Sequence, residues 1–129
     1  MTVELQMLAL SVVLGLVQIV IASHAASLQR GYWWTASARD AVVQPLTGVA
    51  GRLERALYNF LETFPLFAAA VLIAHFADRH NWLTVWGAYL YFGARVVYIL
   101  LYAFGVPVVR SLVWNVATLG ICMILIALL

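Results

Sequence analysis

The chain has 129 residues, of which 66% are hydrophobic and only 9% are charged, and its mean hydropathy is +1.01. A water-soluble domain usually has about 45–50% apolar and about 25% charged residues, so this composition excludes an ordinary soluble domain. All seven basic residues are arginines and the formal net charge is only +2, which argues against nucleic-acid binding. The composition instead predicts a small polytopic membrane protein.

Four apolar segments follow one another along the chain, each near the 20 or so residues that a membrane-spanning helix needs. They cover about residues 5–28, 55–77, 82–104 and 108–129, and they lack the alternation of a barrel strand. No basic residue precedes the first segment, and it is too long for a signal peptide, so we expect it to be retained as a helix. The sequence therefore predicts an all-α fold, a single domain formed by a four-transmembrane-helix bundle.

The connections between the segments predict the orientation in the membrane. The only long loop covers residues 29–51 and contains the helix breakers Gly31, Pro45, Gly48 and Gly51. Five arginines lie in or beside this loop and the last loop, whereas Arg79 alone lies on the opposite side; the five are Arg30, Arg39, Arg52, Arg55 and Arg110. The positive-inside rule then places the long loop in the cytoplasm and both termini on the non-cytoplasmic side.

Two charged residues fall deep within the predicted helices, where each costs roughly 2.5–3.5 kcal/mol on insertion scales. Glu62 lies seven residues after Arg55, and Arg95 lies seven residues before Tyr102. At 1.5 Å per residue, both are roughly 10–15 Å below the same membrane surface. We therefore expect an ion pair between Glu62 and Arg95, which on the simplest interpretation only holds two helices in register.

Polar residues extend along one face of each of these two helices. Arg55, Asn59 and Glu62 have the spacing i, i+4, i+7, and Arg95, Tyr98 and Tyr102 have the spacing i, i+3, i+7. Singly, these residues can be interpreted as interfacial aromatics and helix-pairing amides. Together with Arg110 and Ser111, however, they converge on the cytoplasmic half of the bundle. Several arginines beside a carboxylate suit a small anionic ligand that carries an amine.

Two segments resemble the MAPEG family, the membrane-associated proteins of eicosanoid and glutathione metabolism. The sequence Arg52-Leu-Glu-Arg55-Ala-Leu-Tyr-Asn59-Phe-Leu-Glu62-Thr-Phe-Pro65-Leu-Phe67 is similar to the family's second-helix signature. The stretch that begins at Arg95 and ends at Ser111 is similar to its third-to-fourth-helix segment. The length and the four-helix layout match as well, so the resemblance covers nearly the whole chain.

The resemblance implies a homotrimer that binds glutathione between neighbouring subunits, in the cytoplasmic half of the membrane. The residues expected to hold the tripeptide are Arg52, Arg55, Asn59, Glu62, Arg95, Tyr98 and Tyr102, with Arg30 as a further contact. Arg110 matches an arginine thought to stabilise the glutathione thiolate, and Ser111 matches a serine proposed to assist catalysis. The expected activity is that of a glutathione transferase or peroxidase, which conjugates or reduces lipophilic electrophiles that arrive from the bilayer.

Two other functions remain open at this stage. One is a non-enzymatic lipid-binding protein of the same family, and the other is a structural bundle in which Glu62 and Arg95 only fix the helix register. We expect no metal site, because His75, Asp78 and His80 lack a convincing fourth ligand. Asn115 is interpreted as a structural residue that bonds between helices.

Overall fold

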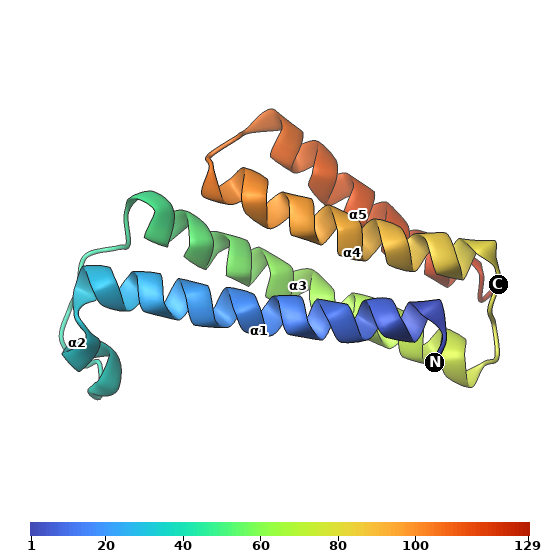
Figure 1. The fold of residues 1–129 in the computed structure, drawn as a ribbon, viewed down its shortest axis with the longest axis horizontal. Helices are drawn as coiled ribbons and strands as arrows, with labels where there is room; N and C mark the ends of the chain where they lie inside the picture. Colours follow the sequence, from blue (N-terminus) through green and yellow to red (C-terminus); the bar gives the residue numbers. More distant parts are fainter.

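The computed structural model describes residues 1–129 and contains helices but no strands. The long helices are α1 (Val3–Arg30), α3 (Gly48–Phe76), α4 (Trp82–Ala103) and α5 (Val108–Ile126), and the short helix α2 (Tyr32–Ala36) follows α1. Both termini lie at one end of the bundle, whereas α2 and the α4–α5 connection lie at the other (Figure 1). The expected all-α four-helix bundle is confirmed.

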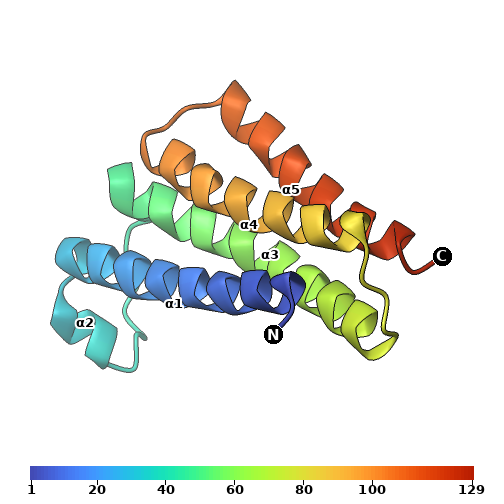
Figure 2. The same cartoon turned by 45° about the vertical axis from the view of Figure 1, so that its right-hand side comes forward.

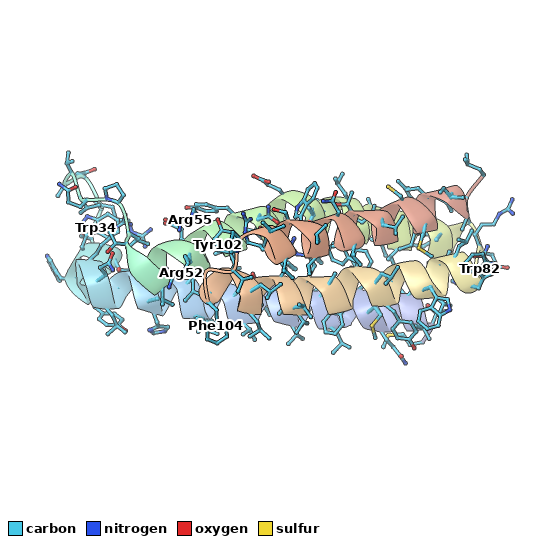
Figure 3. The ribbon with its side chains drawn as sticks, turned by 90° about the horizontal axis from the view of Figure 1, so that it is seen from above. Trp34, Arg52, Arg55, Trp82, Tyr102 and Phe104 are labelled. Carbon is cyan, nitrogen blue, oxygen red and sulfur yellow. The ribbon has the colours of Figure 1, made fainter.

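All four long helices are long and apolar enough to cross a membrane. Trp34 of α2 lies at one end of the bundle and Trp82, the first residue of α4, lies at the opposite end (Figure 3). Tryptophan is enriched where a membrane meets water, so the two residues mark the expected interfaces on either side of the hydrocarbon layer.

Local hydrogen bonds explain where several helices begin and end. Thr2 caps α1 by accepting a bond from the Leu5 N–H, and Asn81 and Thr84 form a reciprocal capping box at the start of α4. α1 ends at Arg30, and the φ of 96° at the following Gly31 lets the chain reverse into α2. A 2.7 Å hydrogen bond between the Ser27 and Thr35 hydroxyls then holds α2 against α1.

The second membrane helix begins at Gly48, seven residues before the expected start, so Gly51 lies inside the helix and is not a breaker. Gly48 has a φ of 60° and marks the turn at which the helix begins. The Gln29 side chain explains part of this difference, because it accepts from the Thr47 N–H at 2.9 Å and donates to the Thr47 carbonyl at 3.2 Å. These bonds fix the residue that precedes α3 against the end of α1. The last helix ends at Ile126, three residues before the expected end.

The core lies between α3, α4 and α5. Phe67 of α3 and Tyr91 of α4 are fully buried and stack with ring centroids 4.0 Å apart. Alanine and glycine fill much of the remaining interface, which allows the helix backbones to approach closely, as is common in membrane bundles. α1 packs on α3 and α4 but not on α5, so α3 and α4 form the middle of the bundle (Figure 2).

Candidate functional site

Most of the predicted site residues gather towards the end of the bundle that lies away from the termini. Figure 3 shows Arg52 and Arg55 of α3 beside Tyr102 of α4, close to Phe104, the residue that follows the end of α4. Three helices therefore contribute to this region, because the start of α5 adds Arg110 and Ser111. The convergence that the helical spacing predicted is observed for α3, α4 and α5.

The two arginines of α3 anchor that helix to the end of α4. The Arg52 Nε donates a 3.0 Å hydrogen bond to the carbonyl of Ala103, which is one of the C-terminal carbonyls that have no partner within a helix. The Arg55 Nε donates to the Tyr102 hydroxyl at 3.2 Å. Arg55 is itself exposed, so part of its guanidinium is free to bind an anion.

Arg110 of α5 lies over the aromatic pair Tyr98 and Tyr102. Its Nη1 donates to the Tyr98 hydroxyl at 3.2 Å, and its guanidinium carbon is 4.7 Å from the centre of the Tyr102 ring. The two tyrosine rings meet edge to face, with centroids 5.6 Å apart. This aromatic surface fixes the position of a cation and leaves its remaining N–H groups available.

Arg95 is 1% exposed and does not form the expected ion pair. Its Nη1 donates to the Asn59 side-chain oxygen at 2.8 Å, and its guanidinium carbon lies 4.4 Å from the centre of the Tyr98 ring. Glu62 is exposed on the protomer and has no hydrogen-bonded partner. The prediction of a Glu62–Arg95 pair was wrong because Asn59, about one turn nearer to the start of α3, occupies the position that faces Arg95.

A pocket of about 150 Å³ opens beside these residues. Its lining comes from all three helices and consists of Asn59, Tyr98, Arg110, Ser111, Trp114 and Asn115. Sequence reasoning missed Trp114, and it assigned Asn115 a bond between helices. The Asn115 Nδ2 instead donates to the Ser111 carbonyl within α5, at 2.9 Å. The spacing of Ser111 and Asn115, which is i, i+4, was the available signal that both lie on one face.

Arg30 lies apart from this cluster, in a second pocket of about 400 Å³ between α1, α2 and α3. It donates to the Gln44 carbonyl at 3.2 Å, and its guanidinium carbon is 5.1 Å from the Trp34 ring centre. Glu54 also lines this pocket. Within one protomer, Arg30 is therefore not brought together with the other predicted site residues.

The site is strongly cationic. The only ion pair in the structure joins Glu4 and His80, where α1 meets the α3–α4 turn at the opposite end of the bundle. None of the four arginines Arg52, Arg55, Arg95 and Arg110 has a carboxylate partner. Their partners are neutral oxygens and aromatic rings, so the positive charge of the site is not neutralised, and this favours an anionic ligand.

Fold and site together define an integral membrane protein, a helix bundle with an arginine-rich polar site near one end. The chain belongs to the MAPEG family, whose sequence profile matches residues 7–129. Comparisons with curated proteins and with solved structures find no match. The family includes glutathione-dependent enzymes as well as other proteins, so membership establishes the class of protein but not an activity.

Proposed function

We propose that this protein is a glutathione-dependent membrane enzyme that conjugates or reduces lipophilic electrophiles. The observation that carries the proposal is the position of Arg110. It lies on Tyr98 and Tyr102, has no carboxylate partner and lines a pocket. A fixed cation of this kind favours the thiolate form of a bound thiol, and the thiolate is the nucleophile in conjugation.

The donors and acceptors around Arg110 suit the rest of the glutathione molecule. The tripeptide carries two carboxylates, which guanidinium groups bind well. Arg55 and Arg52 lie about one and two turns before the pocket residue Asn59 on α3. The α-amino group of the tripeptide needs an acceptor, which Glu62 can supply from the same helix. Ser111 follows Arg110 directly and offers a hydroxyl donor at the pocket.

The exposure of Glu62 supports a site that is shared between subunits. A carboxylate that faces away from its own protomer at this depth is expensive in lipid unless a ligand or a neighbouring chain covers it. We infer a homotrimer in which a neighbouring subunit closes this face. Arg30, which lies apart from the cluster in its own protomer, is then the residue that the neighbour could contribute.

The second substrate enters from the bilayer in this proposal. Trp114 lies about one turn from Arg110, and exposed apolar residues of α5, such as Leu112, lie nearer still. A lipophilic electrophile can therefore approach the thiolate without passing through water. The arginine-rich end of the bundle faces the cytoplasm, where glutathione is available, and both termini lie on the other side.

The test is a titration of the detergent-purified protein with glutathione, followed by the ultraviolet difference spectrum of the thiolate. The wild type should give a saturable thiolate signal at neutral pH, and Arg110→Ala should lose it. Arg79→Ala is the matched control, since Arg79 is an exposed arginine in the turn at the opposite end. A wild type that stays folded without any thiolate signal would contradict the enzyme and favour the lipid-binding function.

A further inference from the structure

No contact with another helix accounts for the position of the Asn115 amide. It lies within a membrane-spanning helix, is exposed and makes one side-chain hydrogen bond, to a carbonyl of its own helix. That bond does not strengthen the helix, because asparagine side chains that bond to nearby backbone groups compete with the helical hydrogen bonds. A polar side chain at this depth that joins no other helix is a candidate for ligand recognition.

The side chains that surround the amide make a pocket of hydrogen-bond donors. Arg110 can only donate, Ser111 has a free hydroxyl, and the Asn59 oxygen is already occupied by Arg95. No carboxylate lines the pocket. Oxygen atoms of a ligand that accept hydrogen bonds therefore find several donors in this space.

Asn115 lies farther into the membrane than Arg110, by five residues or roughly 7.5 Å along α5. The two donors therefore serve different atoms. Arg110 is placed for the thiolate, and Asn115 is placed for an oxygen that the lipophilic substrate carries at some distance from its reacting carbon. Trp114, the preceding residue, offers an aromatic wall for the carbon chain between them.

We propose that Asn115 selects lipids that contain an α,β-unsaturated carbonyl group, by donating a hydrogen bond to the carbonyl oxygen. This inference rests on the proposed function. In such lipids the carbonyl carbon is two atoms away from the carbon that a thiolate attacks. In an epoxide the oxygen is bonded to the attacked carbon itself, and an alkyl halide has no oxygen. The separation between Arg110 and Asn115 favours the conjugated carbonyl.

The reaction balances without an oxidant or a reductant. The thiol proton leaves to water as the thiolate forms beside Arg110. The sulfur then bonds to the β-carbon, and the electron pair of the carbon–carbon double bond shifts to give an enolate. The carbonyl oxygen gains negative charge in this step, so a donor already aimed at it stabilises the transition state more than the ground state. Water finally protonates the α-carbon.

The first experiment needs neither glutathione nor turnover. A saturated ketone, 2-nonanone, is added to the full-length protein in a maltoside detergent that lacks carbonyl groups, and the infrared carbonyl band is recorded. A hydrogen bond lowers the stretching frequency, so the wild type should show a shifted band that Asn115→Leu abolishes. Thr118→Val is the matched control, because the Thr118 hydroxyl bonds only to the Trp114 carbonyl and lies outside the pocket.

The second experiment compares two electrophiles, trans-2-nonenal and benzyl bromide. Asn115→Leu should lower the ratio of their kcat/KM values about tenfold, which is the upper range for one neutral hydrogen bond. An unshifted ketone band in the wild type, or a shifted band that survives in Asn115→Leu, overturns the inference even if the thiolate forms. Loss of the oligomer in Asn115→Leu would overturn it too, since the amide would then join subunits. A wild type without thiolate or turnover overturns the proposed function instead.

Discussion

The Arg95 guanidinium donates a 2.8 Å hydrogen bond to the side-chain oxygen of Asn59 and so joins α4 to α3 inside the bundle. Arg95 is 1% exposed and no carboxylate neutralises it. The Tyr98 ring covers its other side, at 4.4 Å from the guanidinium carbon. A neutral amide and an aromatic face thus stabilise a buried cation, which leaves its charge available to attract an anion to the adjacent pocket.

Removal of the Asn59 oxygen should destabilise the bundle. Asn59→Ala leaves Arg95 buried with its ring contacts alone, and a hydrogen bond to a charged group contributes about 1.5–3 kcal/mol. We expect a loss of about 2 kcal/mol in the free energy of unfolding, measured by denaturation in mixed detergent micelles. Asn59→Asp keeps the acceptor and should retain the stability. Equal stability of Asn59→Ala and wild type would show that Arg95 does not depend on this bond.

The Tyr98 hydroxyl offers a separate test of how Arg110 is held. Tyr98→Phe keeps the ring under Arg95 and Arg110 and removes only the acceptor of the 3.2 Å bond. Under the proposed function, kcat should fall about tenfold while glutathione affinity changes less, because a mobile cation stabilises the thiolate less well. Tyr89→Phe, at an exposed tyrosine of the same helix, is the control. Unchanged kcat would mean that Arg110 is positioned by other contacts.

Hydropathy and helical spacing predicted the main architecture because each depends on one strong physical constraint. Lipid permits only helices or closed barrels, so four apolar runs were enough to predict four helices. The start of α3 was missed because residues 48–54 include Arg52 and Glu54, and apolarity marks the membrane crossing rather than the whole helix. The short α2 has no apolar run of its own and depends on the Ser27–Thr35 bond.

Spacing alone could not predict which polar residues would meet. Asn59 and Glu62 share a face of α3, yet three residues correspond to a rotation of roughly 60° about the helix axis. That angle separates a side chain that faces Arg95 from one that faces out of the protomer. The meeting of Arg55 with Tyr102, in contrast, joins two residues near the ends of adjacent antiparallel helices, where few other pairings were possible.

Because α4 and α5 approach closely, substitution of one glycine by alanine should destabilise the bundle much more than substitution of another. A Cβ on Gly120 would lie 2.5 Å from the Gly87 carbonyl oxygen and 2.9 Å from the Tyr91 nitrogen, both backbone atoms. Gly120→Ala should therefore force the helices apart and cost about 1–3 kcal/mol of stability. Gly93 of α4 has open space around it, so Gly93→Ala should be neutral or slightly stabilising. Thermal unfolding of both variants tests this prediction, and similar melting temperatures would contradict the close packing at Gly120.

The orientation can be tested with single cysteines, because Cys122 is the only cysteine and Cys122→Ser removes it. In that background, Ala41→Cys places a thiol in the loop between α2 and α3, and Ala77→Cys places one at the α3–α4 turn; both positions are exposed. In sealed vesicles with the cytoplasmic face outward, a membrane-impermeant maleimide should label position 41 directly. Position 77 should react only after permeabilisation, and the reverse pattern would place the arginine-rich site on the non-cytoplasmic side.

The buried carboxylate at the opposite end should stabilise the bundle independently of the site. Glu4 is 2% exposed; it accepts a hydrogen bond from the Thr84 hydroxyl and lies 3.3 Å from the His80 ring nitrogen. Thr84→Val removes one of these partners and the capping bond to the Asn81 N–H, so we expect a loss of about 1–3 kcal/mol. Thr84→Ser retains the hydroxyl and should restore most of the stability. Because α1 is held to α4 here, far from Arg110, glutathione affinity at a permissive temperature should not change. A change in affinity would mean that the two ends of the bundle are coupled through α1.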